Sequence, residues 1–284
     1  MEHRVSVEVS GPWSLTTSKN FWEGFAPASL AEQQDGAALQ TVFVNESDWS
    51  QTRASISQQG QTAHLELSGS GDLEAAADQV CRFLAIDIDA TGWPEVGDRD
   101  PVIAQAQKDL PGLRPCGFHS PYEAAAWSVL SQRIRITQAA NLRERLIEQH
   151  GERGAFPRPS VLRGVDLDLP GRTAEYLHAV ADAALEGRLD GSRLRSVDPV
   201  EAMASVQEVK GLGPFAAELV VIRGANAPDA LPTQERRLSD EISESYGADA
   251  TLREVSDIWR PFRTWASVYL RVLRERRTHE IKST

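Results

Sequence analysis

The chain has 284 residues, of which 41% are hydrophobic and 25% charged, an ordinary composition for a globular protein with room for two domains. It contains no run of about 18 apolar residues and no signal-like apolar stretch near its start, so we expect a cytoplasmic protein that does not bind membranes. Its two cysteines are too few for an iron-sulfur cluster or a four-thiolate zinc site.

The net charge of -11 is unevenly distributed. Residues 1–100 contain 5 Lys and Arg against 16 Asp and Glu, whereas the remaining residues contain 25 of each kind. The excess of acid therefore lies within the first hundred residues. These acidic residues would repel a negatively charged partner only where the partner approaches residues 1–100.

The first part of the chain shows strand patterns. Hydrophobic residues alternate in two segments, and residues 39–44 form an apolar, β-branched run, so we predict a small antiparallel sheet. A helical period begins at Asp72. Residues 91–101, rich in Pro, Gly and Asp, are typical of a connection between domains. We therefore predict two domains, residues 1–100 and 101–284.

The second part shows helical patterns. Ser120, followed by Pro121 and Glu123, predicts the start of a helix. Further helices are predicted at residues 137–150, 172–186, 235–243 and 261–274. The fold class is therefore α+β, with a small amino-terminal antiparallel sheet and helix followed by an all-helical domain.

Residues 209–224, VKGLGPFAAELVVIRG, contain two glycines before a new helix. At Gly211 and Gly213 the backbone can turn sharply and bring its N–H groups close to an anion, and Pro214 suits the first helical turn. The letters also fit a dinucleotide motif with Ala216, but that motif requires a preceding strand, and Asp198 with Pro199 predicts a helix there. A purely structural corner between two helices is the remaining alternative.

Five segments in a fixed order resemble one known family, the helix-hairpin-helix DNA glycosylases, in particular the bacterial DNA-3-methyladenine glycosylase II group. The hairpin is one segment. The others are PGLRPCGFHSPYEAAAWSVLSQRIRITQAA from Pro111, LPGRTAEYLHAVADAALEGRL from Leu169, PDALPTQERRL from Pro228 and WRPFRTWASVYL from Trp259. The resemblance implies removal of a damaged, probably alkylated, base from duplex DNA by hydrolysis of its N-glycosidic bond, in base-excision repair.

The family places a catalytic aspartate shortly after the hairpin helix, and Glu235 occupies that position here. Glutamate keeps the charge but adds a methylene group, and an alignment shifted by one residue would put the neutral Gln234 there instead. Related enzymes with a lyase step carry a lysine where this chain has Phe215, so the resemblance implies a monofunctional glycosylase. The alternative is a weakened or inactive DNA-binding member of the same fold.

The resemblance also implies sites for DNA, for the base and for a cation. The DNA-binding positions are Gly211, Gly213, Ala216, Gln132 and Arg133, where Arg133 replaces an apolar wedge. The base-pocket positions are Tyr122, Trp127, Phe215, Leu219, Trp259, Trp265 and Arg271. Backbone carbonyls of Gln207, Val209 and Leu212 correspond to a monovalent-cation site, and no other cofactor is implied.

The expected partner is double-stranded DNA containing a damaged base, bound by a monomer. Because acidic residues 1–100 would repel DNA, we expect their carboxylates to face away from the duplex.

The aromatic cage that relatives use for a cationic base is incomplete, since Leu219 and Arg271 stand at two of its positions.

Overall fold

The computed structural model describes residues 1–24, 37–169 and 171–279. Its amino-terminal part is built on a four-stranded sheet of order β1-β4-β3-β2. Every neighbouring pair is antiparallel, which confirms the predicted antiparallel sheet. The strands are β1 (Glu2–Glu8), β2 (Leu39–Val44), β3 (Gln51–Gln59) and β4 (Thr62–Gly69).

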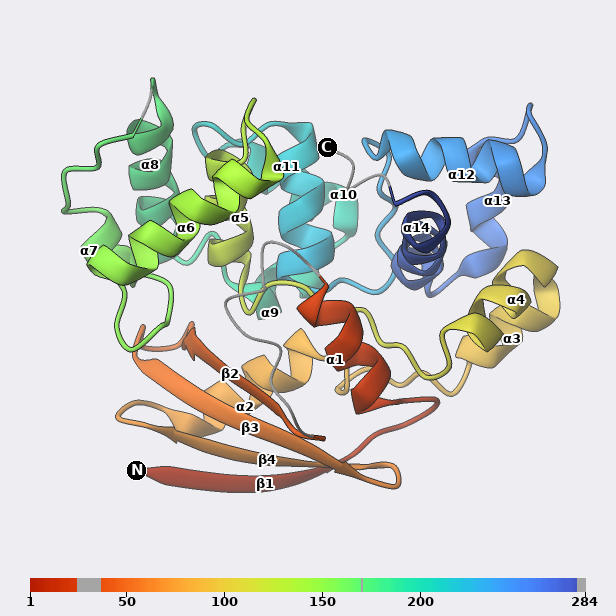
Figure 1. Cartoon of the computed structure of the whole chain (residues 1–284), viewed down its shortest axis with the longest axis horizontal. Coiled ribbons are helices and arrows are strands. Elements are labelled where there is room, and N and C mark those ends of the chain that lie inside the picture. The colour runs from red at the N-terminus through yellow and green to blue at the C-terminus, as the bar shows by residue number, and fades with distance from the viewer. Residues whose placement is uncertain (25–36, 170, 280–284) are drawn as a thin grey trace.

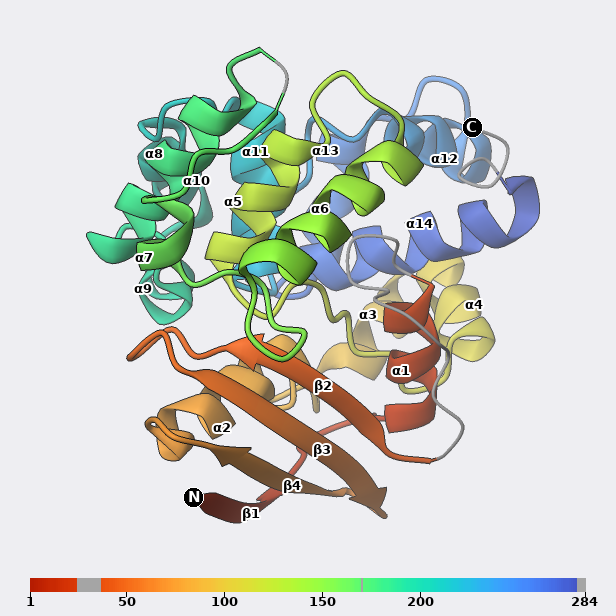
Figure 2. The same ribbon diagram turned by 60° about the vertical axis from the view of Figure 1, so that its left-hand side comes forward.

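One face of the sheet is apolar because alternate side chains of each strand point to the same side. On β3 and β4 the side chains of Ala54, Ile56, Leu65 and Leu67 are at most 2% exposed. Helix α2 (Leu73–Phe83) packs against this face and begins at Asp72, whose carboxylate accepts a hydrogen bond from the Ala75 N–H at 3.0 Å. This sheet and α2 form the base of the molecule (Figure 2).

The remaining elements are helices, and the α+β fold class is confirmed. Figure 1 shows them in a layer above the sheet. They are α1 (Leu15–Glu23), α3 (Trp93–Arg99), α4 (Pro101–Asp109), α5 (Pro121–Leu130), α6 (Ile136–His150), α7 (Pro159–Leu162), α8 (Thr173–Leu185), α9 (Gly191–Ser196), α10 (Pro199–Gln207), α11 (Pro214–Leu219), the π-helical η1 (Val220–Gly224), α12 (Arg236–Tyr246), α13 (Leu252–Val255), the 3-10 helix η2 (Ser256–Trp259) and α14 (Arg263–Thr278).

Residues 91–101, which we interpreted as a connection between domains, contain regular helix. Most of this stretch is α3, and α4 follows it directly, because Pro94 and Pro101 lie in the first turns of these helices, where a missing N–H is tolerated. Trp93 of α3 is 2% exposed and joins the same apolar cluster as residues of α14. The domain division between residues 100 and 101 stays a prediction, and the helices on both sides of it share this cluster.

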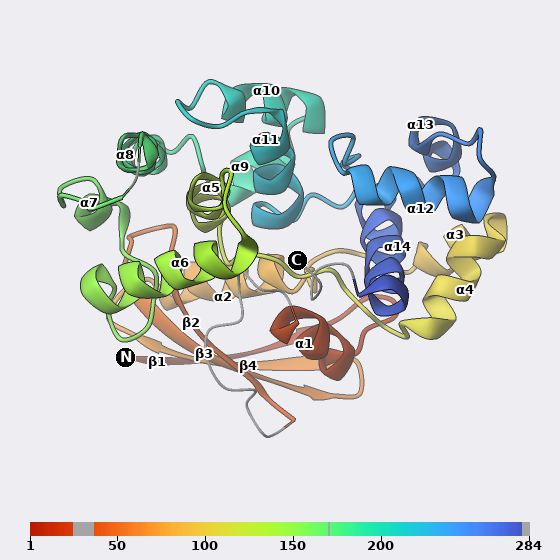
Figure 3. The ribbon, with the colours of Figure 1, turned by 45° about the horizontal axis from the view of Figure 1, so that its top comes forward.

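The hairpin helices α10 and α11 lie at the side of the helical layer away from the sheet (Figures 1 and 3). Exposed acids of the strands, such as Glu2, Glu8 and Glu66, therefore belong to the opposite side of the molecule. No helix in the described residues is long and apolar enough to cross a membrane.

Candidate nucleic-acid interface and base cavity

The two hairpin glycines differ in backbone conformation and surroundings. Gly211 has a φ of +94°, and a Cβ atom there would lie 2.4 Å from Cγ of Tyr176. Gly213 has an ordinary φ of -91° as the residue before α11, and a Cβ atom there would have no heavy atom within 4 Å. Gly211 therefore forms the turn, whereas Gly213 leaves the backbone open to an approaching ligand.

Helices flank the hairpin on both sides. α10 begins at Asp198, whose carboxylate accepts a hydrogen bond from the Val200 N–H at 2.9 Å, and it ends at Gln207. α11 follows from Pro214. The dinucleotide-binding alternative is therefore wrong, because it requires a strand directly before the glycine turn.

The loop after α5 supports the hairpin. Gln132 donates from Nε2 to the Gly211 carbonyl at 2.8 Å, which fixes the turn from outside. The next residue, Arg133, is exposed and has a φ of +58°, a backbone conformation that is unusual for a side chain other than glycine. Such strained positions are found preferentially at functional sites, where surrounding structure holds them.

A cavity of about 470 Å³ lies beside the hairpin helix. Its walls come from α1, α11, η1, α14 and the segment leading to α12. Five of the predicted site residues line it, namely Trp127, Phe215, Leu219, Glu235 and Arg271. Phe215 is 54% exposed and gives the cavity an open apolar wall.

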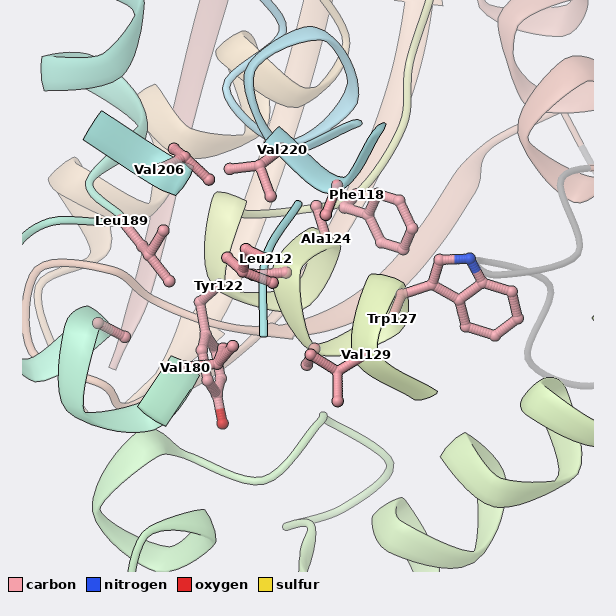
Figure 4. Close-up of a cluster of buried hydrophobic side chains, with 14 of the residues drawn as sticks. Phe118, Tyr122, Ala124, Trp127, Val129, Val180, Leu189, Val206, Leu212 and Val220 are labelled. Carbon is pink, nitrogen blue, oxygen red and sulfur yellow. The ribbon is translucent and has the colours of Figure 1, made fainter. Parts of the chain in front are cut away.

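The other three predicted pocket aromatics do not line this cavity. Tyr122 lies within a core cluster on the opposite side of α5 from Trp127 (Figure 4), and its hydroxyl donates to the Pro157 carbonyl at 2.8 Å. Burial raises the pKa of Tyr122 well above its ordinary value. Trp259 and Trp265 are fully buried in the cluster around α14. Aromatic residues at helical spacing fill cores as readily as pockets, so the pattern alone did not separate them.

Glu235 is held at the start of α12. Its Oε1 accepts a hydrogen bond from the Arg237 N–H at 3.2 Å, and its Oε2 lies 3.7 Å from Arg271 Nε. The side chain is 32% exposed and borders the cavity. A carboxylate is thus fixed at the cavity by one helix start and one arginine from α14.

Glu218 is a site residue that the sequence pattern did not reveal. It belongs to α11, is 8% exposed, and accepts hydrogen bonds from Thr233 N–H at 2.8 Å and from Thr233 Oγ1 at 2.5 Å. Its second carboxylate oxygen accepts from the Gln234 N–H at 2.9 Å. Glu218 thereby fixes the two residues directly before Glu235. The available signal was a single acid within the apolar run of the hairpin helix.

Arg223 closes the inner end of the cavity. One of its terminal nitrogens donates to the Cys116 carbonyl at 2.5 Å, and its guanidinium carbon lies 5.0 Å from the centre of the Phe21 ring. Burial lowers the pKa of Arg223 to about 10, so the group remains a cation at neutral pH.

The fold, with its helix-hairpin-helix turn, is shared with solved DNA glycosylases. The 3-methyladenine DNA-glycosylase of Archaeoglobus fulgidus superposes with a TM-score of 0.74 at 17% identity, covering 98% of this chain and 99% of that one. The 8-oxoguanine glycosylase/lyase of Clostridium acetobutylicum, in complex with DNA, superposes with a TM-score of 0.68 at 16% identity, covering 98% of each chain.

Sequence similarity points to the same class. The chain is 27% identical to a Bacillus subtilis DNA-3-methyladenine glycosylase over 206 residues, 65% of this chain and 67% of that protein. It is 28% identical to Escherichia coli DNA-3-methyladenine glycosylase 2 over 173 residues, 56% of this chain and 60% of that protein. No family model matches the chain. The chain thus shares its fold with solved DNA glycosylases and is similar in sequence to DNA-3-methyladenine glycosylases.

Proposed function

We propose that the protein is a monofunctional DNA glycosylase of base-excision repair that hydrolyses the N-glycosidic bond of a damaged base. The observation that carries this proposal is the position of Glu235, a carboxylate fixed at the cavity next to an open glycine hairpin. The names of the relatives, DNA-3-methyladenine glycosylases, support the same activity and make alkylated purines candidate substrates.

Double-stranded DNA is the proposed partner, held by its backbone at the hairpin. The first N–H groups of a helix have no partner within that helix, and at α11 they follow the open Gly213 and include Ala216. Gln132 holds the turn, and Arg133 stands where a side chain can enter the space left by a displaced nucleotide. The target base must leave the stack because its glycosidic bond is unreachable inside the duplex.

The proposed chemistry needs one carboxylate and water. As the bond between base and sugar breaks, positive charge builds up on the sugar, and the Glu235 carboxylate stabilises that charge or orients the attacking water. Phe215 supplies no amine for a Schiff base, and no lysine of the described residues lines the cavity. The product is then an abasic site in an uncut strand.

The hairpin also has backbone groups that fit a monovalent cation. The carbonyls proposed to hold it belong to Gln207, Val209 and Leu212. The Val209 carbonyl accepts a hydrogen bond from the Leu212 N–H at 3.0 Å, and a carbonyl oxygen keeps a second lone pair for a ligand. Bound there, a cation would stabilise the turn and add positive charge near a DNA phosphate.

The activity is tested on duplexes that carry 3-methyladenine, 7-methylguanine, hypoxanthine or uracil. We expect strand breaks only after alkali treatment, because the enzyme leaves an abasic site without cutting the strand. Tight, salt-sensitive binding with no base released from any duplex would instead identify a DNA-binding protein that has lost catalysis.

Gly213→Ala is expected to leave the melting temperature unchanged, since the added methyl group meets no protein atom. DNA affinity should fall by about 1–3 kcal/mol, roughly fivefold to 150-fold, because the methyl group blocks phosphate from the amides. The salt dependence of binding should persist, since no cationic side chain is lost. Gly164→Ala, where the nearest atom is 3.7 Å from the added methyl group, is the matched control. Unchanged affinity of Gly213→Ala would contradict phosphate binding here.

Glu218→Ala is expected to slow base release by about tenfold to a hundredfold, because the segment carrying Glu235 loses its anchors. DNA affinity should stay at the wild-type level, since Glu218 is separate from the hairpin turn. Single-turnover rates and binding are measured together, with Glu218→Gln expected to recover part of the rate. Equal loss of rate and affinity would show general damage to the fold instead of a positioning role.

A further inference from the structure

Arg271 lines the cavity and has a buried hydrogen-bond donor without a partner in the described part of the chain. It projects from α14, its side chain is 17% exposed, and its Nε lies 3.7 Å from Glu235 Oε2. One of its terminal nitrogens, Nη1, is buried and has no hydrogen-bond partner among the residues that the structure describes. A buried donor of this kind is stabilised when a bound ligand supplies an acceptor.

The chemistry of a guanidinium group determines what that ligand must present. Guanidinium has only donors, in a planar fork that suits carbonyl oxygens and unprotonated ring nitrogens. Glu235 lies near the Nε edge of Arg271. The Nη1 edge has no partner among the described residues, and Arg271 itself lines the cavity.

The charges around the cavity also favour a neutral base over a cationic one. Its lining contains four arginines, at positions 223, 237, 271 and 276, and three glutamates, at 218, 235 and 275. The carboxylate of Glu218 already accepts hydrogen bonds from the backbone N–H groups of Thr233 and Gln234. A base carrying a positive charge would meet repulsion from Arg271, whereas a neutral base would not.

The shape accommodates a flat base. A volume of about 470 Å³ is within the usual range for small-molecule sites. Phe21, Trp127 and Phe215 provide aromatic surface in the lining. Aromatic faces stack on any base, so they give affinity without selecting its edge, and the selection is left to polar groups.

We propose that Arg271 is a specificity-determining residue that selects neutral bases with a carbonyl edge, such as hypoxanthine, over cationic alkylated purines such as 3-methyladenine. This inference rests on the proposed glycosylase function and narrows it. The Arg271 guanidinium donates to the carbonyl oxygen or ring nitrogen of the displaced base while Glu235 faces the sugar.

The test compares two substrates for each variant. Single-turnover release of hypoxanthine and of 3-methyladenine is measured for the wild type, Arg271→Leu and Arg271→Lys, together with binding to the same duplexes. Arg253→Leu, at an exposed position on α13 outside the cavity lining, is the matched control. Loss of the ion pair to Glu235 changes both rates together, so the ratio of the two rates reports selection.

With each enzymatic rate divided by the spontaneous release rate of the same base, we expect the wild type to favour hypoxanthine by at least about tenfold, the discrimination that one hydrogen bond supplies. Arg271→Leu should abolish or reverse that ratio, Arg271→Lys should weaken it, and Arg253→Leu should keep it.

A ratio that Arg271→Leu leaves unchanged, or a wild-type preference for 3-methyladenine, would overturn the inference while the glycosylase function stands. If the wild type releases neither of these bases and no base from the 7-methylguanine and uracil duplexes, the proposed function fails. Hypoxanthine-selective binding that Arg271→Leu removes would then still support the inference, and its absence would overturn it.

Discussion

Glu235→Gln is expected to lower the rate of base release by about a hundredfold to a thousandfold, the usual effect of removing one electrostatic stabiliser of a transition state. Glutamine has nearly the same size, so the start of α12 and the cavity shape are retained. The loss therefore reports the missing negative charge beside the developing positive charge on the sugar. Single-turnover rates at saturating enzyme measure it, and DNA affinity should stay unchanged.

Two controls separate Glu235 from its neighbours. Gln234→Ala should release base at the wild-type rate, because Gln234 is exposed and its contact with Glu218 uses only the backbone N–H. Glu275→Gln removes a different acid from the cavity lining and should have a far smaller effect. A wild-type rate in Glu235→Gln together with a large loss in Gln234→Ala would show that the family's catalytic position is Gln234 in this chain.

Asp100→Ala is expected to lower the free energy of unfolding by about 3–5 kcal/mol, because several buried donors lose their acceptor at a cost of about 1–3 kcal/mol each. Asp100 is 1% exposed, and its Oδ1 accepts from the N–H groups of Val102 at 2.9 Å and Ile103 at 3.3 Å. Its Oδ2 accepts from the Tyr246 hydroxyl and from Trp259 Nε1, both at 2.7 Å. Alanine leaves four donors without this acceptor.

Denaturant unfolding measures the effect of Asp100→Ala. The matched control is Asp98→Ala, which removes an exposed acid two residues earlier and should change stability by less than about 0.5 kcal/mol. An equally small change in Asp100→Ala would contradict the role of Asp100 as the point that joins α4 to the carboxyl-terminal helices.

Elements with local signals were predictable from the sequence. The starts of α5 at Ser120 and of α10 at Asp198 were predicted from the capping residue and the proline after it, because these interactions lie within one helical turn. Helices α1 and α3 were missed because their signals are weak. α3 contains proline, glycine and two acids, and it is buried through Trp93, which packs on α14. That contact joins residues far apart in the chain.

The candidate site was predictable in part for the same reason. Gly213, Phe215 and Glu235 follow a motif with fixed spacing, and the structure brings Phe215 and Glu235 to one cavity. The role of Glu218 depends on a loop that returns to α11, which no spacing rule describes. The separation of Trp127 from Tyr122 depends on which side of the buried helix α5 faces the cavity.

The most direct test of the central claim measures free base and uncut abasic strand in one single-turnover reaction of the wild-type protein. Monofunctional hydrolysis at the Glu235 cavity predicts equal amounts of both products, with strand breaks appearing only after alkali. Strand breaks before alkali would contradict the monofunctional mechanism. The absence of free base from every damaged duplex that the protein binds would contradict the glycosylase function itself.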